Sequence, residues 1–280
     1  MTDIAAATTK PRPRRGFFLL AGATLLTIFL ILALLGATIA RYDPNAQDLL
    51  AMLDPPSAAH WFGTDEIGRD IASRVIVGTR ITLLIALGAV TFAGIAGIGL
   101  GLIAGYARGT IDRLTMLCLD LLMTIPSLVL AIAVVAAIGA NAAGLVTAIT
   151  ISFIPSLARL VRARVLELQD LDYVEAARAI GMRPTRIMRR HILPNAVTVI
   201  VIELSLMAGQ AVLVGSALGF LGLGVQPPAP EWGAMLGASR QFLEVAPHVA
   251  VVPGLAVSLL VLAFNLFGDG LRDWLDPTVT

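Results

Sequence analysis

The chain has 280 residues and a formal net charge of +1; 57% of its residues are hydrophobic and only 14% are charged. An ordinary soluble domain has about 45–50% apolar and about 25% charged residues, so this composition excludes one. It predicts an all-α membrane protein that crosses the bilayer several times.

The chain begins with a basic tail, residues 1–16, which carries one lysine and three arginines. The apolar run that follows, residues 17–40, is longer than the 7–15 residues of a signal-peptide core, and no sharp small-residue cleavage site closes it. We therefore interpret this run as the first membrane span and the tail as a cytoplasmic extension.

A helical span needs roughly 20 apolar residues to cross about 30 Å of hydrocarbon. Six segments approximately meet this requirement, and they make residues 17–280 a transmembrane domain. The predicted spans are residues 17–40, 81–105, 114–138, 143–160, 196–222 and 249–268. An even number of spans places both termini on the same side of the membrane.

The distribution of basic residues predicts the orientation. With the N-terminus inside, fifteen lysines and arginines lie on the cytoplasmic side and five lie outside. The positive-inside rule therefore favours cytoplasmic termini. The outer connections are then residues 41–80, a short turn near 139–142, and 223–248. The inner connections are a tight turn at 106–113 and a polar island from about 161 to 195.

Glycines at a spacing of three to four residues predict closely packed helix faces in two spans. They are Gly97, Gly101 and Gly105 in the second span and Gly215, Gly219 and Gly222 in the fifth. In the third span, Pro126 removes one backbone hydrogen bond and predicts a kink.

Two acidic residues, Asp120 and Glu203, lie inside predicted spans, about two turns from the cytoplasmic face. Because a charge in lipid is costly, such residues are usually paired or functional. We expect ion pairs with Arg113, Arg159 or Arg162 rather than a relay for protons or ions.

The polar island predicts two short helices. Asp172, followed three residues later by Glu175, has the spacing of a capping box. The helix then runs through Ala176 and Ala177, whose small side chains would let another surface come close. Gly181 can adopt the left-handed conformation that ends it.

The second helix of the island is predicted to begin at Pro184, whose missing N–H is harmless in a first turn. His191 lies at its basic end, where positive charge complements the helix dipole. Leu193 and Pro194 are expected to end it and to lead into the fifth span. Such an element, held at both ends by membrane spans, can transmit a displacement.

Several catalytic classes are excluded or disfavoured. The only lysine, Lys10, is not part of a phosphate-binding Gly-x4-Gly-Lys-Ser/Thr loop, so ATP hydrolysis of that type needs another polypeptide. None of the three histidines has the His-Glu-x-x-His spacing of zinc proteases. The single cysteine, Cys118, excludes an intrachain disulfide and a cysteine metal cluster. We predict a non-catalytic chain without a metal or cofactor site.

Two other functional classes remain as alternatives. An intramembrane hydrolase could use Ser239 and His248, but no Gly-x-Ser-x-Gly elbow surrounds the serine. An ion-driven carrier is disfavoured because the sequence shows no repeated halves, and the polar island has no obvious role in such a protein.

The polar island resembles the signature loop of permease subunits in binding-protein-dependent ABC importers. The family pattern is Glu-Ala-Ala, three residues, Gly, nine residues, an apolar position, one residue and Leu-Pro. It is matched here by Glu175, Ala176, Ala177, Gly181, Leu193 and Pro194. His191 stands where the general pattern has isoleucine, a change that the dipeptide, oligopeptide and nickel branch tolerates.

Three further stretches resemble that branch: residues 60–70, 226–233 and 268–277. The likeness covers nearly the whole chain beyond residue 15 and is closest to the second of two paired permeases. The first stretch also has a local interpretation, because Asp70 is suited to cap a helix over residues 71–80 that runs into the second span.

The resemblance implies a type I ABC importer permease in a bacterial inner membrane. Its implied partners are a second permease subunit (giving a heterodimer), two cytoplasmic ATPase subunits and an extracytoplasmic solute-binding protein, with no nucleic acid. The helix around residues 175–180 would dock in a cleft of the ATPase, with Gly181 as its elbow. His191, Leu193 and Pro194 would anchor the loop. The implied cargo is a di- or oligopeptide, with nickel, glutathione or opines as alternatives.

Overall fold

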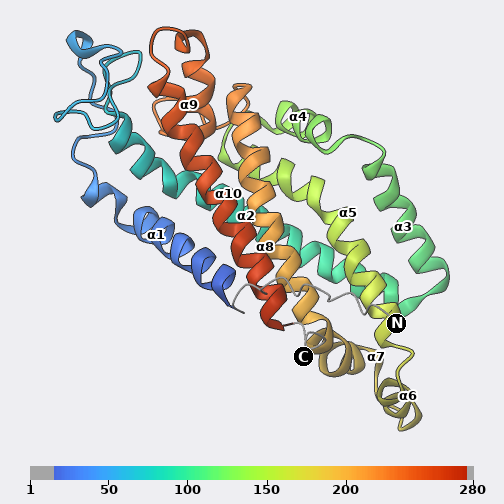
Figure 1. The fold of residues 1–280 in the computed structure, drawn as a ribbon. Helices are drawn as coiled ribbons and strands as arrows, with labels where there is room; N and C mark the ends of the chain where they lie inside the picture. The colour runs from blue at the N-terminus through green and yellow to red at the C-terminus, as the bar shows by residue number, and fades with distance from the viewer. Residues whose placement is uncertain (1–15, 276–280) are drawn as a thin grey trace, which may run out of the picture.

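The computed structural model describes residues 16–275 as a bundle of long helices with shorter elements at both ends (Figure 1). The long helices are α1 (Phe17–Ile39), α2 (Ile71–Ala107), α5 (Ala142–Leu168), α8 (Leu193–Phe220) and α10 (His248–Leu275). Each is long and apolar enough to cross a membrane. Five of the six predicted spans are therefore confirmed as helices. The predicted tail up to residue 15 and the end of the 268–277 stretch lie outside the described residues.

The third predicted span is broken. Its two halves, α3 (Gly109–Met123) and α4 (Ser127–Ile138), meet at 89°. Pro126 lies at the break with an extended backbone, because it lacks an N–H and disfavours a helical residue before it. The predicted kink is confirmed, and it divides the span predicted over 114–138 into two helices. In Figure 1, α4 lies across the upper end of the bundle while α3 follows its length.

The connections are shorter than predicted because polar residues continue the helices. α2 extends to Ala107 and α3 begins at Gly109, so the inner turn predicted over 106–113 is reduced to Arg108. Arg108 adopts a positive φ of 51°, which lets one residue reverse the chain. α10 likewise continues beyond its apolar run to Leu275.

The glycine seam of α2 packs directly on α5, as predicted. A Cβ atom on Gly97 would lie 3.0 Å from Leu157 Cβ. On Gly101, it would lie 2.6 Å from the carbonyl oxygen of Ala158. Any larger residue at Gly101 therefore meets backbone that cannot move aside. This close approach increases dispersion contacts between the two helices.

The second predicted seam is only partly correct. Gly215 faces Ile149 of α5, and Gly219 leaves no room for a Cβ atom beside Glu231. Gly222 lies beyond the end of α8, where it has a φ of 79° and open space around its Cβ position. Its N–H donates to the carbonyl oxygen of Gly219. Gly222 therefore ends the helix and does not continue the packed face.

The two long connections at one end of the bundle form a loop platform, defined here as residues 41–70 and 223–247 (Figure 1). It contains the short 3-10 helices Leu49–Ala51 and Arg240–Phe242 and one α-helix, α9 (Trp232–Ser239). Trp232 is fully buried, and its Nε1–H donates to the carbonyl oxygen of Val75 at 3.0 Å. Its ring packs edge-on against Phe29, so it joins α1, α2 and α9.

Buried polar contacts hold the loop platform together. Asp65 accepts the Nε–H of Arg69 at 2.6 Å, and both side chains are less than 10% exposed. Asp70 accepts the N–H of Ser73 at 2.8 Å, which confirms its predicted capping of α2. Glu231 caps α9 in the same way. Burial raises the pKa of Glu231 above its ordinary value, although hydrogen bonds from two backbone N–H groups oppose the shift.

Candidate functional site

The polar island forms α6 (Asp172–Ala179), α7 (Pro184–Ile187) and a single π-helical turn, η2 (Met188–Ile192), which leads into α8. We call residues 169–192 the α6–α7 segment. It projects from the end of the bundle opposite the loop platform (Figure 1). Its position confirms the prediction of two short helices between the fourth and fifth spans.

The start of α6 differs from the predicted capping box. The helix begins at Asp172, so Leu171 is the capping residue and no side chain caps the helix. The carbonyl oxygen of Leu171 accepts the N–H of Glu175 at 3.2 Å. Asp172 lies one position too late to cap, because its own N–H already belongs to the first turn. Both acidic side chains still lie in that turn, where the helix dipole favours negative charge.

α6 has one buried face and one free face. Val174 and Ala177 are buried, so the expectation that Ala177 is open to another surface is wrong. Glu175 and Ala176 are exposed, and Ile180, at the end of α6, is 78% exposed. The free face therefore combines an acid, a small residue and a large apolar side chain in the part of the chain that projects furthest.

Gly181 ends α6 as predicted. Its φ is 76°, its N–H donates to the carbonyl oxygen of Arg178, and the next N–H, of Met182, donates to Ala177. This pair of bonds is the Schellman arrangement. No atom lies within 4 Å of the Cβ position of Gly181, so backbone conformation alone requires glycine there.

The second helix begins at Pro184 as predicted but does not end at Leu193 and Pro194. The N–H of Leu193 donates to the carbonyl oxygen of Met188, five residues earlier. This wider turn accommodates a proline, which has no N–H to donate, and the helix continues without a break. His191 lies in the π-turn, where its ring is 6.2 Å from that of Tyr173 in α6.

A buried glutamine ties the α6–α7 segment to the bundle. The Nε2–H of Gln169 donates to the carbonyl oxygen of Gly105 at 3.1 Å, and its Oε1 accepts from Arg178 of α6 at 3.2 Å. The Arg178 guanidinium also lies 5.4 Å from the ring centre of Tyr106. This link was not predicted from the sequence, where its only signal is a lone amide, Gln169, directly after the fourth predicted span and its charged end.

The two intramembrane acids have different partners. Asp120 pairs with Arg159, one of the predicted partners, whereas Arg162 pairs with Asp112 through two hydrogen bonds. Among residues 16–275, Glu203 makes no ion pair, so its predicted pairing is wrong. Asp120 lies about 16 Å, or three turns, along α3 from its start at Gly109.

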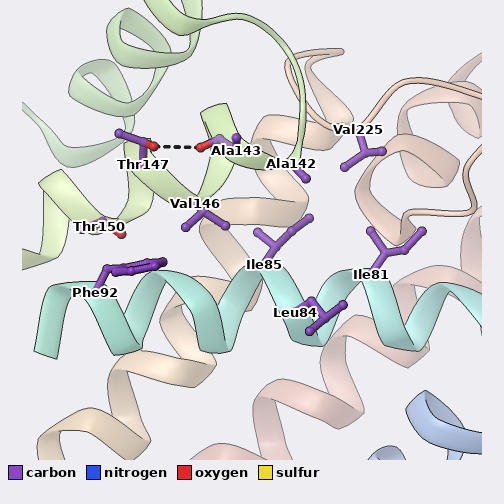
Figure 2. A pocket seen from close by; sticks show the side chains of 10 residues that line it. All are labelled: Ile81, Leu84, Ile85, Phe92, Ala142, Ala143, Val146, Thr147, Thr150 and Val225. Atoms are coloured by element: carbon purple, nitrogen blue, oxygen red, sulfur yellow. Dashed lines mark hydrogen bonds between the residues drawn. The ribbon is translucent and has the colours of Figure 1, made fainter. Parts of the chain in front are cut away.

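The largest apolar groove and the predicted alternative sites offer little chemistry. A groove of 710 Å³ between α2 and α5 is apolar, as Figure 2 shows, with Ile85, Phe92 and Val146 among its lining residues. Its two hydroxyls, on Thr147 and Thr150, donate to the backbone carbonyl oxygens of Ala143 and Ala89. Within residues 16–275, no cluster of histidine, cysteine or carboxylate side chains is arranged to hold a metal. Ser239, the candidate nucleophile, donates to a backbone carbonyl oxygen.

Comparison with known proteins places these features in a family. The chain is 49% identical over 237 residues to the glutathione transport system permease protein GsiD of Pectobacterium atrosepticum, covering 84% of this chain and 79% of that one. It is 46% identical to the GsiD protein of Escherichia coli, covering 96% and 89%. It is 44% identical to the dipeptide transport system permease protein DppC of Alkalihalophilus pseudofirmus, covering 91% and 84%.

The fold is also similar to a solved structure. A chain of the inward-facing MetNI methionine ABC transporter superposes with a TM-score of 0.61 at 20% identity, covering 72% of this chain and 96% of that one. Residues 97–280 match the model of the family described as binding-protein-dependent transport system inner membrane component. The chain belongs to this family and is an inner-membrane permease subunit of a binding-protein-dependent ABC importer.

Proposed function

We propose that the free face of α6 docks on a separate cytoplasmic ATPase, which powers solute import through this chain and a second permease subunit. The observation that supports this proposal is that α6 has one exposed face and one face packed against the bundle. Glu175, Ala176 and Ile180 are exposed, while the opposite face is packed and Arg178 is bonded to the bundle through Gln169. Such a helix can receive a force on one side and deliver it on the other.

The proposed orientation places both termini and the α6–α7 segment in the cytoplasm. The arginines of that segment and the excess of basic residues on its side support this choice. The basic tail, residues 1–16, then precedes a transmembrane domain over residues 17–280. The loop platform faces outward, where an extracytoplasmic solute-binding protein would meet it. A heterodimer with two ATPase subunits completes the proposed assembly.

Coupling then follows a short physical path. Closure of the ATPase pair displaces α6, and the contacts of Arg178 and Gln169 carry the displacement to Gly105, at the end of the α2–α5 seam. His191, Leu193 and Pro194 carry the same motion into α8. A partner shifts the inward–outward equilibrium only if it binds the two states with different affinities, so the link must be rigid enough to distinguish them.

The proposed cargo is a small peptide, with glutathione as the second candidate. Relatives named for glutathione transport and for dipeptide transport are both similar along most of the chain. Glutathione is itself a peptide with free carboxylate and ammonium groups. The two candidates therefore share one chemistry, and the ligand of the cognate binding protein distinguishes them.

A cross-linking experiment tests the docking proposal. In a Cys118→Ala background, Ala176→Cys is labelled with a benzophenone maleimide and illuminated in the assembled transporter. We expect cross-links to the ATPase. The matched control is Leu50→Cys, 97% exposed on the loop platform, which should give none. Equal ATPase cross-linking from both positions, or none from Ala176→Cys, would contradict the proposal.

A second experiment tests the coupling path. Gln169→Leu leaves the Gly105 carbonyl oxygen and Arg178 without their partner but keeps the side-chain volume. We expect peptide uptake by proteoliposomes to fall at least tenfold while ATP hydrolysis continues. Asp170→Asn, next in sequence but exposed, is the control and should transport normally. A parallel loss of assembly or of ATP hydrolysis would show a folding role for Gln169 instead.

A further inference from the structure

A second cavity, of 590 Å³, lies on the α3, α5 and α8 side of the chain and differs in kind from the apolar groove. Met123 of α3 and Val199 of α8 are on its two edges. Its floor is the inner half of α5, which supplies Ser156, Arg159, Arg164 and Glu167. Charged groups of both signs therefore line a groove between helices that cross the membrane.

The exposure of these charges excludes lipid as their neighbour. Arg159 and its partner Asp120 are 51% and 53% exposed, although Asp120 lies about three turns inside α3. A half-exposed ion pair at such depth is tolerated facing a water-filled cavity or a polar partner, and not facing acyl chains. On α1, by contrast, the exposed side chains are uncharged, and Leu30 and Leu34 are among them.

Arg164 pairs with Glu167 through Nη1 at 2.7 Å, but two further polar groups lack a partner within residues 16–275. The Nε atom of Arg164 is buried and has no hydrogen-bond partner among the described residues. Glu203 makes no ion pair within residues 16–275. It lies four residues after Val199, on the same face of α8. A buried N–H donor in the groove and a carboxylate without an ion-pair partner, one turn beyond Val199 on α8, are the two halves of a site for a ligand with both charges.

We propose that this groove is a water-filled part of the translocation pathway that holds a zwitterionic solute. Arg159 and Arg164 bind the carboxylate of the solute, since a guanidinium can form two parallel hydrogen bonds to it. Glu203 binds the ammonium group. Asp120 neutralises Arg159 while the groove is empty. This inference rests on the proposed function, because it assigns a peptide-like cargo to the permease.

The first test measures water access without transport. Ser156→Cys in the Cys118→Ala background is treated with a charged methanethiosulfonate reagent in the complete transporter in nanodiscs, where both membrane faces are open. We expect rapid labelling, at least tenfold faster than that of Leu30→Cys, the control on α1. Equal slow labelling at the two positions would overturn the proposal, because the groove would then be closed by lipid or protein.

The second test separates binding from structural pairing. Uptake of dialanine is measured for Arg159→Gln, for Glu203→Gln and for the exchange Asp120→Arg with Arg159→Asp. We expect each single variant to lose at least tenfold in uptake, with assembly and stimulated ATP hydrolysis retained, and the exchanged pair to remain defective. The proposal would be overturned if the exchanged pair recovered dialanine uptake and Glu203→Gln took up dialanine normally. The Asp120–Arg159 pair would then have a purely structural role.

The two tests distinguish a failure of this inference from a failure of the proposed function. If the wild-type transporter does not import dialanine, the proposed cargo is wrong, and the labelling of Ser156→Cys still decides whether the groove is open to water. If dialanine is imported but Ser156→Cys is not labelled, the cargo stands and the groove is not the pathway.

Discussion

The two polar regions at opposite ends of the bundle use the same residue types in opposite ways. In the loop platform, Asp65, Arg69 and Glu231 are buried and bonded to neighbouring groups. In the α6–α7 segment, Arg183 and Arg186 are exposed to solvent. In the loop platform, the charges are bonded to other groups of the same chain. The α6–α7 segment leaves the charges of these two arginines exposed to solvent, which suits its proposed docking on a separate ATPase.

This contrast concerns packing more than composition. Each region contains a short helix with a fully buried side chain, Trp232 in α9 and Val174 in α6. Trp232 joins three helices, whereas α6 is tied to the bundle mainly through Gln169 and a few apolar contacts. We therefore expect substitutions in the loop platform to reduce stability and substitutions in the α6–α7 segment to reduce coupling.

The largest expected effect is at Trp232. Trp232→Ala should destabilise the protein by about 3–5 kcal/mol, because it opens a cavity and removes the bond to Val75. Thermal unfolding of the purified transporter in detergent measures the loss. Trp274→Ala is the control at the other end of the bundle, where the side chain is 66% exposed, and it should change little. Similar losses in both variants would remove the distinction between the two ends.

The next largest difference in stability is expected between two variants that each break one ion pair, one at each end of the bundle. Asp65→Asn should cost about 3–5 kcal/mol, since it removes the buried carboxylate that faces both Arg69 and Arg74 and leaves Arg69 paired only with Glu66. Asp170→Asn breaks the Arg108 pair, whose side chains are 54% and 66% exposed, and should cost about 0–1 kcal/mol. The midpoint of thermal unfolding should therefore fall clearly only in the first variant. A reversed order would contradict the burial assigned to these pairs.

Gly181 should affect coupling more than stability. Gly181→Val forces a β-branched residue into the left-handed region, at a local cost of about 1–2 kcal/mol, and should abolish transport while membrane insertion persists. Gly181→Asn should retain much of the uptake, because asparagine tolerates that conformation. Immunoblots of membranes and uptake by vesicles measure both properties. Equal activity of the two variants would show that the elbow conformation is not required.

The smallest expected effect is the pH response of Glu231. Since burial raises its pKa in the folded state, its contribution to stability is complete below the ordinary pKa of 4.5 and is lost as pH rises through the raised value. Glu231→Gln should remove this loss, so the stability of the variant relative to the wild type should increase with pH. Unfolding midpoints at several pH values test the sign, and a constant difference would contradict it.

Much of the fold follows from local patterns in the sequence. Apolar runs, the glycines of α2 and the positions of Pro126 and Pro184 act through the residues themselves, so they could be interpreted without neighbours. The angle at Pro126 could not be predicted, because a missing N–H permits a bend without setting its size. The ends of α8 and α10 were also missed, since hydropathy marks lipid-facing residues and not helix length.

The candidate site was predicted less completely. Gly181 depends only on its own backbone conformation and was identified correctly. The burial of Ala177, the partner of Gln169 and the lack of an ion pair for Glu203 within residues 16–275 all depend on residues distant in sequence. Asp172 was misassigned by one position, because a capping box and an acidic first turn have the same residue types.

The π-turn at Met188–Ile192 has a mechanical consequence. Because the helix is unbroken from Pro184 to Phe220, its 37 residues form a rod about 55 Å long. One end of this rod is in the α6–α7 segment, and the other packs on Glu231 beneath the loop platform. In the proposed orientation, a displacement at either end would travel along this continuous helix, so the arrival of a solute-binding protein on one face of the membrane could reach the ATPase on the other face.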